Sequence, residues 1–351
     1  MPSWLPLSEL LLLTPLDRCK KFFALKQLVF VLLSLFLVLG CQSDVASSTE
    51  EPSPASPPKE ALPVPKFDRD SAYAYVEQQV NFGPRVVNSD AHRLTKNWLV
   101  EKLEAFGAEV TEQDFEAKAF DGTILSATNI IARYAPEETD RILMAAHWDT
   151  RPFADSDLED DPNAIVNGAD DGASGVGVLL EVARQLGRNK PNIGVDIVLL
   201  DAEDYGESGD SDSYALGAQY YARNLVSPKP RFGILLDMVG ARDATFLVEG
   251  NSERYAPDVV RKVWRLADQM GYGNYYVDER GGGVIDDHYF INTIARIPTI
   301  DIINLKKDGG QAFAPHWHTG DDNLDVIDKR TLKAAGQVVL AAVFREAAGT
   351  L

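Results

Sequence analysis

The chain has 351 residues, of which 45% are hydrophobic and 25% are charged, as is ordinary for a water-soluble globular protein. Its formal net charge of −19 at pH 7 argues against nucleic acid as a partner, because phosphate binding needs a basic face. The length allows one large α/β domain or two small ones.

The first 40 residues have the plan of a secretory signal. Lysines precede an apolar run over residues 28–39, and the small Gly40 stands directly before Cys41. This order resembles the cleavage box of bacterial lipoproteins, in which the cysteine is lipidated after cleavage. We therefore expect residues 1–40 to be a signal peptide and Cys41 to carry a lipid. A short transmembrane anchor is the alternative, although the run is shorter than the roughly 20 residues that a span needs.

A flexible tether is expected next. Residues 41–66 are rich in Ser, Pro, Glu and Ala and hold too few large apolar side chains to bury a core. Both cysteines of the chain, Cys19 and Cys41, precede the body, so the body has no disulfide. We expect residues 67–351 to form a single domain of an exported lipoprotein. Gln42 is compatible with attachment to the outer membrane facing the periplasm, so the membrane is an expected partner through the lipid anchor.

Two helices and a hairpin open the body. The second helix should carry its apolar residues, among them Leu94 and Leu99, on one face and should end at Gly107. The turn of the hairpin is predicted at Asp121-Gly122. The helices are predicted over residues 68–79 and 89–106, and the strands over residues 108–115 and 123–134.

Strands and helices then alternate to the end of the chain. This order is typical of an α/β fold, with a mostly parallel central sheet, helices on both faces and antiparallel strands added by the hairpin. Strands are predicted over residues 143–147, 195–200, 232–237 and 298–303, and helices over residues 176–186, 214–224, 257–271, 287–292 and 329–347.

Acidic residues and histidines stand where these strands end. The strand over residues 195–200 leads into Asp201-Ala202-Glu203-Asp204, and other strands lead into His147 and Asp237. After the last strand and a loop comes His318. Because open α/β sheets bind ligands at the carboxyl ends of their strands, the pattern predicts a metal site at this edge.

An acidic loop precedes the first long helix of the alternating part. Residues 151–167 are interpreted as a solvated loop or a calcium site. The loop closes on Asp171, which is either the N-cap of the helix or a metal ligand. Small residues on both sides, Gly168 and Gly172, would let the backbone approach a bound ion closely.

The residue types at these positions suit catalytic zinc. Asp171, Asp204 and His318 would supply three ligands, which leaves the fourth position open for water or substrate. Glu203 can face that open position and act as general base and acid.

Asp237 and Asp286 add two further carboxylates to the predicted site. Crowding several carboxylates raises the pKa of at least one of them, which provides a proton that the group can share.

The motifs resemble those of the zinc aminopeptidase-like family, with its phosphorylase/hydrolase-type fold, and more closely its glutaminyl-peptide cyclotransferase branch. The resemblance extends over nearly the whole body, from about residue 68 to the C-terminus. It rests on His147-Trp148-Asp149, Gly168-Ala169-Asp170-Asp171, Asp201-Ala202-Glu203-Asp204, Leu236-Asp237, Asp286-Asp287-His288 and Trp317-His318-Thr319.

The resemblance implies both roles and a reaction. It implies one zinc ion per chain, and peptides or proteins with an N-terminal glutamine as partners. The implied reaction converts that glutamine to pyroglutamate and releases ammonia. By resemblance Asp171, Asp204 and His318 match the zinc ligands, Glu203 the acid/base, and Asp237 and Asp286 the proton-relay partners.

The substrate pocket is less defined by the sequence. Trp317 is expected to form one wall, with Tyr214 and Phe313 as further candidates. The chain departs from many relatives in having Glu203-Asp204 in place of two successive glutamates. An acidic loop over residues 206–213 also replaces the tryptophan-bearing loop of animal cyclases.

Two other functions remain open at this point. In a two-zinc aminopeptidase, His147 and Asp237 would bind a second metal and Glu203 would activate a bridging water. A lipid-tethered ectodomain without activity is the non-enzymatic alternative.

Overall fold

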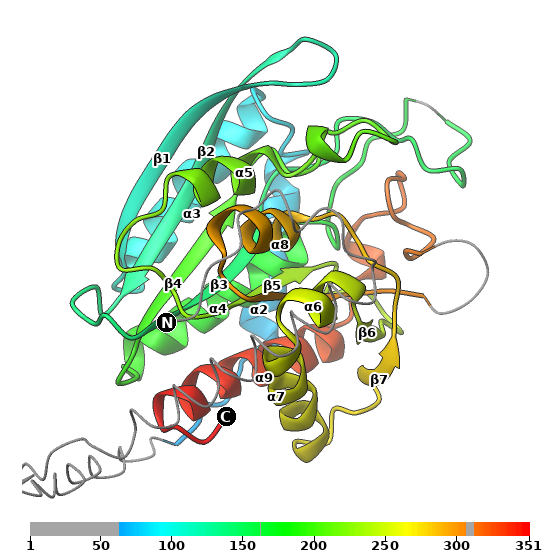
Figure 1. Ribbon diagram of the computed structural model, residues 1–351. Helices are drawn as coiled ribbons and strands as arrows, with labels where there is room; N and C mark the ends of the chain where they lie inside the picture. Colours follow the sequence, from blue (N-terminus) through cyan, green and yellow to red (C-terminus); the bar gives the residue numbers. More distant parts are fainter. Residues whose placement is uncertain (1–62, 162, 307–311) are drawn as a thin grey trace, which may run out of the picture. The chain divides into compact units, whose positions relative to one another are not determined.

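The computed structural model describes residues 63–351, except residue 162 and residues 307–311 (Figure 1). The expected signal peptide, the expected lipidation site Cys41 and most of the expected tether therefore lie outside the described residues. Within the described ranges, no helix combines the length and the apolar character that crossing a membrane requires.

A six-stranded sheet forms the centre of the fold, in the order β1-β2-β4-β3-β5-β8. The pairs β1/β2 and β2/β4 are antiparallel, whereas β4/β3, β3/β5 and β5/β8 are parallel. This confirms the predicted α/β class, with the hairpin adding the antiparallel strands. The strands are β1 (Glu109–Lys118), β2 (Ile124–Tyr134), β3 (Arg141–His147), β4 (Gly194–Leu200), β5 (Gly233–Asp237) and β8 (Thr299–Ile303).

Helices cover both faces of the sheet (Figure 1). Side chains of β3 alternate between two buried clusters, with Ile142 and Met144 in one and Leu143 and Ala145 in the other. The first cluster packs against α2 (Arg69–Phe82), α3 (Asp90–Ala105), α4 (Ala173–Arg188), α7 (Pro257–Gln269) and α9 (Lys329–Ala347). The second packs against α5 (Leu216–Arg223), α8 (Asp287–Phe290) and the π-helix Ile291–Ala295.

The connections around β3 create a crevice at its carboxyl end. Helix α4 links β3 to β4 across one face, and α5 links β4 to β5 across the other face. Because β4 and β5 lie on opposite sides of β3, the chain changes direction at this strand. Open α/β sheets bind their ligands at such a switch point. The fold therefore places the ends of β3, β4 and β5, with their polar residues, around one crevice.

Some elements differ from the prediction. Helix α5 begins at Leu216, because Ala215 takes a left-handed conformation (φ 51°), and Tyr214 therefore lies in the preceding loop. A small parallel sheet was not predicted, since strands of three to five residues show little periodicity. It is formed by β6 (Phe246–Val248) and β7 (Tyr276–Arg280), with the short helix α6 (Gly250–Tyr255) between them in sequence.

Helix α3 turns its expected face inward, with Leu99 and Leu103 fully buried, and departs from the prediction at one residue. Ser89 caps its first turn by accepting the backbone N–H of His92. Leu94, predicted to be buried, is 44% exposed, whereas His92 and Thr95 are buried. The reason is specific: the His92 ring stacks on Trp148, and its Nε2 lies 2.9 Å from the carboxylate of Asp201.

Candidate active site

One cavity of about 330 Å³ collects the predicted site residues at the carboxyl end of the sheet. All proposed ligands, acids and wall residues line it, although they come from segments far apart in the sequence. His147 lies buried beside the cavity at the end of β3. The predicted residues that line it are Asp171, Glu203, Asp204, Tyr214, Asp237, Asp286, Phe313, Trp317 and His318.

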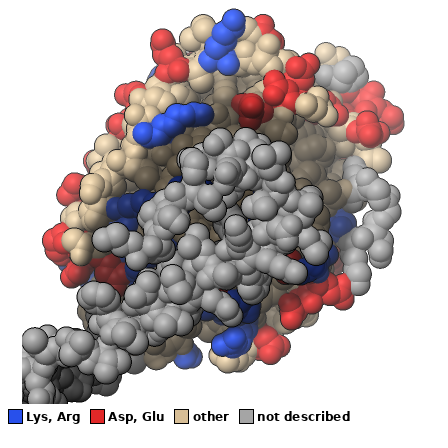
Figure 2. All heavy atoms as spheres, in the orientation of Figure 1, with Lys and Arg blue, Asp and Glu red and all other residues tan. Residues whose placement is uncertain are grey.

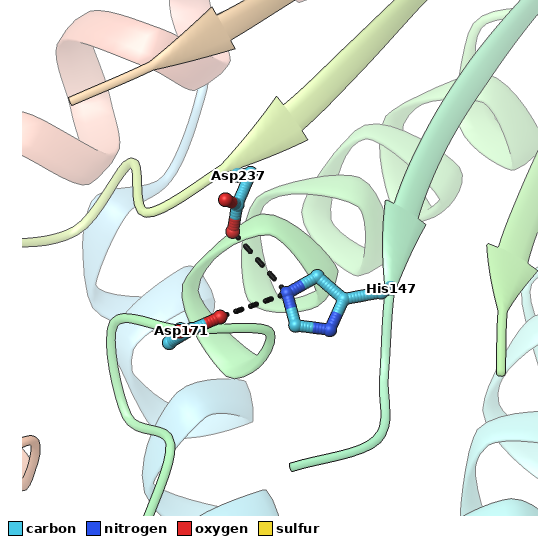
Figure 3. A group of neighbouring side chains, drawn as sticks. All are labelled: His147, Asp171 and Asp237. Carbon is cyan, nitrogen blue, oxygen red and sulfur yellow. Dashed lines mark hydrogen bonds and ion pairs between the residues drawn. The ribbon is translucent and has the colours of Figure 1, made fainter. Parts of the chain in front are cut away.

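His147 joins two of the carboxylates (Figure 3). Its Nε2 lies 3.0 Å from Asp171 Oδ1 and 3.2 Å from Asp237 Oδ1. Its Nδ1 is buried without a hydrogen bond, at 3.5 Å from Asp149. In the described part of the chain, His147, Asp171 and Asp237 form one of the groups that are compact enough to hold a metal ion.

Asp171, Asp204 and His318 form a second such group. His318 Nε2 lies 3.1 Å from Asp204 Oδ1 and 3.8 Å from Asp171 Oδ2. Oδ2 of Asp204 is buried and has no hydrogen-bond partner. An imidazole and two carboxylates are donors that zinc prefers, and a lone buried carboxylate oxygen is costly unless a cation compensates it. The group therefore fits a zinc ion by its chemistry.

Three of the non-glycine residues with a left-handed backbone lie at the site. Ala202, Met238 and His318 have φ angles of 53°, 47° and 57°, in the left-handed region. Such a conformation costs a non-glycine residue roughly 1–2 kcal/mol and is concentrated at functional sites. Two of these residues stand next to Glu203 and Asp237, and the third is a proposed ligand, so the strain falls on the turns that aim these side chains.

The loop that carries Asp171 depends on a glycine. Gly172 has φ 86°, and an added Cβ would lie 2.8 Å from the carbonyl oxygen of Asp149 and 3.0 Å from the His147 ring. Any side chain would therefore push apart the loop and the end of β3. Gly172 therefore lets the Asp171 loop pack closely against the end of β3.

Glu203 is a buried acid at the cavity wall. Burial raises its pKa well above the ordinary value; His147 opposes this rise, while the neighbouring carboxylates of Asp204 and Asp286 add to it. Asp149, to which the sequence assigned no role, accepts the backbone N–H groups of Glu203 at 3.0 Å and Asp204 at 3.1 Å. Asp149 thereby fixes the turn that carries both residues.

Asp237 and Asp286 belong to a larger set of buried acids. Burial raises the pKa of Asp237 well above its usual value, and Asp171 adds to this rise. Burial also raises the pKa of Asp286, whose Oδ2 has no hydrogen-bond partner. Asp287 and Asp301 are likewise buried, and their carboxylate oxygens make no hydrogen bond, although Asp301 Oδ2 lies 3.7 Å from His288 Nδ1. Burial raises the pKa of both groups. So dense a group cannot be fully ionised in a dry interior, which allows its members to share protons.

Aromatic side chains form part of the cavity wall. The Trp317 ring stacks on the His318 ring with centroids 3.6 Å apart and planes inclined by 21°. Phe313 packs against Trp317 at a centroid distance of 4.8 Å. Tyr214 lines the cavity from the loop before α5, beside Ser208, Gly209 and Ser211. The acidic loop over residues 206–213 thus contributes small residues to the wall.

The other acidic loop packs against the segment that carries His318. Asp155 Oδ1 lies 3.1 Å from His318 Nδ1, and the backbone N–H of Ser156 donates to the carbonyl of His318. Glu159 accepts the backbone N–H of Gly320 at 2.8 Å. This part of the loop over residues 151–167 therefore has a structural role. Among the described residues, none of the side-chain groups that could hold a metal ion includes a residue of this loop.

Sequence reasoning missed several supporting residues. Asp149 and Arg151 closely follow β3, so their proximity to a strand end was the available signal. Asp322, only four residues after His318, accepts backbone N–H groups of the Asp171 loop. Arg85, from the turn after α2, is fully buried and donates to the carbonyls of Trp148, Asn167 and Gly168. Nothing in its local sequence indicated this role.

Comparison with known proteins identifies similar sequences and folds. Residues 129–343 match peptidase family M28. A glutaminyl cyclase from Bacteroides thetaiotaomicron, solved with bound N-acetylhistamine, is 52% identical, with a TM-score of 0.78 over 80% of this chain and 99% of that chain. A Zn-dependent exopeptidase from Parabacteroides distasonis is 47% identical, with the same TM-score and the same shares.

A curated relative is more distant. The glutaminyl-peptide cyclotransferase of Bos taurus is 23% identical over 244 residues, which cover 61% of this chain and 64% of the relative. The match thus spans slightly less than two thirds of that relative's length.

Proposed function

The chain belongs to peptidase family M28, and on this premise we propose that it is an enzyme of the glutaminyl-peptide cyclotransferase type. Its substrates are peptides or proteins with an N-terminal glutamine, which it converts to pyroglutamyl products with release of ammonia. The observation that carries the proposal is the position of Glu203, an acid with a raised pKa in the same cavity as the Asp171, Asp204 and His318 group. The identity of 52% to a solved glutaminyl cyclase supports it.

Asp171, Asp204 and His318 would hold one zinc ion per chain. Their ligand atoms lie within 4.8 Å of one another, and their side chains are buried. When bound, zinc would supply a Lewis acid for the γ-carbonyl of the substrate glutamine.

Glu203 moves the protons of the reaction. The α-amino nitrogen of the substrate forms a bond to the γ-carbonyl carbon, and the bond from that carbon to the amide nitrogen breaks. Glu203 accepts a proton from the attacking amine and delivers a proton to the departing ammonia, so no water is consumed. A raised pKa suits this double role, because the group must gain and lose a proton near neutral pH. Asp237 and Asp286 can share a proton with Glu203 and thereby stabilise its protonated state.

The cavity walls position the substrate. Ring closure requires the glutamine side chain to bend back on its own amine, so restricting it to that conformation lowers the barrier. Trp317, Phe313 and Tyr214 provide flat apolar surfaces for this purpose. The same side chains exclude water, which would otherwise compete with the amine for the γ-carbonyl.

A two-zinc aminopeptidase is the second candidate, and the His147, Asp171 and Asp237 group favours it. One experiment separates the two: purified protein is incubated with a glutaminyl peptide and with a leucyl peptide. The cyclotransferase releases ammonia from the first and leaves a product lighter by the mass of ammonia. An aminopeptidase instead frees the first amino acid of either peptide.

We also propose that the protein is an exported lipoprotein, anchored through Cys41 in the outer membrane and facing the periplasm. The apolar run, the Gly40-Cys41 pair and the polar tether support this assignment.

A further inference from the structure

Arg151 lies between two of the proposed zinc ligands without touching the cavity. It is the fourth residue after β3, and only 3% of its surface is exposed. An arginine buried beside a catalytic cavity needs an explanation, because a guanidinium is costly to remove from water unless its donors are satisfied.

One edge of the guanidinium is directed to His318. Nε donates to Asp155 Oδ1 at 3.1 Å, and Nη2 donates to Asp155 Oδ2, which is a bidentate pair. Asp155 Oδ1 also lies 3.1 Å from His318 Nδ1. Accepting a hydrogen bond from Nδ1–H makes Nε2 the free, ligating nitrogen and fixes the ring's orientation. The Asp155 side chain is 40% exposed, so it needs the fork of Arg151 to hold it in place.

The other edge is directed to Asp204. Nη1 donates to the backbone carbonyls of Asp204 and Gly206, both at 2.8 Å, and lies 3.8 Å from Asp204 Oδ1. These bonds fix the backbone immediately after Glu203 and the start of the loop over residues 206–213. The plane of the guanidinium also lies near the ring of Tyr214, with Cζ 5.7 Å from its centroid. A single side chain therefore touches the supports of a histidine ligand, a carboxylate ligand and a cavity wall.

We propose that Arg151 is a positioning residue that holds His318, through Asp155, and Asp204, through its carbonyl, in the geometry that binds zinc. The inference rests on the proposed zinc site but not on the identity of the substrate. Its two edges predict two separable effects. Loss of the Asp155 edge weakens zinc binding, and loss of the Asp204 and Gly206 edge additionally displaces the cavity wall and raises KM.

The test compares the zinc dissociation constants of the wild type, Arg151→Lys, Asp155→Asn and the double variant, measured by competition with a chromogenic chelator. Lysine keeps the charge but cannot reproduce the fork. Changes to groups that orient a metal ligand typically lower affinity 10- to 100-fold, which is the expected range for each single variant. Both single variants break the same Arg151–Asp155 pair. The fold-loss in zinc affinity of the double variant should therefore be smaller than the product of the two single fold-losses. At saturating zinc, Arg151→Lys should raise KM more than Asp155→Asn does.

Arg133→Lys is the matched control. Arg133 is also buried, pairs with Asp196, and donates to two backbone carbonyls, but it lies on β2 away from the cavity. Its zinc affinity should equal that of the wild type. A zinc affinity of Arg151→Lys within twofold of the wild type overturns the proposal, as does an equal loss in Arg133→Lys. If Arg151→Lys does not fold, unchanged zinc affinity in Asp155→Asn overturns it instead. Chelator competition reads zinc binding alone, so failure of the cyclotransferase assignment would leave this result intact.

Discussion

Asp322 accepts the backbone N–H of Asp171 at 3.1 Å through one carboxylate oxygen, while the other oxygen accepts the N–H of Asp170 at 2.7 Å. The segment after His318 is thus hydrogen-bonded to the loop that carries Asp171, another proposed ligand. Asp322 is fully buried, and burial together with Asp170 and Asp171 raises its pKa to about 7. These two hydrogen bonds connect the two ligand-bearing loops.

Asp322→Asn should loosen that contact. An asparagine accepts through one oxygen only and presents an NH₂ group to the other backbone N–H, so one buried donor is left unsatisfied. We expect the free energy of unfolding to fall by about 1–3 kcal/mol, measured by urea denaturation with and without zinc. The exposed Asp325→Asn, in the same segment, is the control and should change stability by less than about 0.5 kcal/mol. Equal stabilities of the two variants would contradict this role for Asp322.

Zinc content distinguishes the one-metal site from the two-metal site. Elemental analysis of the purified wild type should give one zinc per chain, and His318→Ala should lose both zinc and activity. His147 belongs to the group with Asp171 and Asp237 and is not one of the three proposed zinc ligands, so the His147→Ala variant should retain one zinc ion. Its zinc affinity should be reduced, because Asp171 loses a hydrogen-bonding neighbour. Two tightly held ions in the wild type, falling to one in His147→Ala, would establish the two-metal site instead.

A buried pair behind the cavity makes a prediction about acid stability. His288 Nε2 lies 2.9 Å from Glu249 Oε2, and both side chains are inaccessible. Although burial raises the pKa of Glu249, the hydrogen bond and charge of His288 and backbone donors lower it to about 2. Because this pKa is depressed from an unfolded value of about 4.3, the stabilisation is complete above pH 4.3 and is lost as the pH falls toward 2.

Glu249→Gln should therefore lower the free energy of unfolding at pH 7 by an amount on the order of 3 kcal/mol. Between pH 4.3 and 2 its stability should fall less steeply than that of the wild type. Chemical denaturation across this range, with the exposed Glu116→Gln as control, provides the measurement. A wild type and a Glu249→Gln variant with parallel stability curves would show that the pair has no depressed carboxylate.

The strand ends were predictable because a short-range pattern determines them. A buried apolar run ending at His147 or Asp237 indicates a parallel strand, and parallel strands deliver their last residues to one edge. Leu94 shows the limit of such patterns. Helical periodicity predicted that Leu94 would be buried. His92 is buried because it contacts two distant residues, Trp148 and Asp201, and no local pattern reveals these contacts.

The supports of the site were not predictable for the same reason. Asp155 and Asp322 contact residues more than 150 positions away in the sequence. Each is an ordinary loop aspartate by its neighbours alone. The left-handed backbone conformation of His318 could not be predicted from the sequence either, because only the fold shows that the turn requires it.

Attachment to the membrane can be tested separately from catalysis. Cys41→Ser should abolish lipid labelling and release the protein from the membrane fraction. The specific activity should stay unchanged, because the polar segment that we propose as a tether separates Cys41 from the folded body. Metabolic labelling with a radioactive fatty acid and cell fractionation provide the two measurements. Undiminished membrane attachment of Cys41→Ser would identify the apolar run itself as the anchor.

Glu203→Gln addresses the chemistry most directly. Glutamine has nearly the same shape and leaves the ligand group of Asp171, Asp204 and His318 in place, so zinc content and stability should be retained. It cannot accept a proton from the substrate amine, and positioned acid/base groups typically contribute about 10²–10⁴-fold. We expect this loss mainly in kcat, since the cavity walls that bind the glutamine side chain are unaltered.

Steady-state kinetics on a glutaminyl peptide, followed by ammonia release, measures the effect of Glu203→Gln. Glu207→Gln, on the exposed part of the loop over residues 206–213, is the matched control and should keep kcat. A Glu203→Gln variant that cyclises at a near-normal rate would leave the reaction intact but transfer the proton role to another carboxylate of the cavity. Asp237 and Asp286 are the next candidates, because burial raises the pKa of both and each lines the same cavity as Glu203.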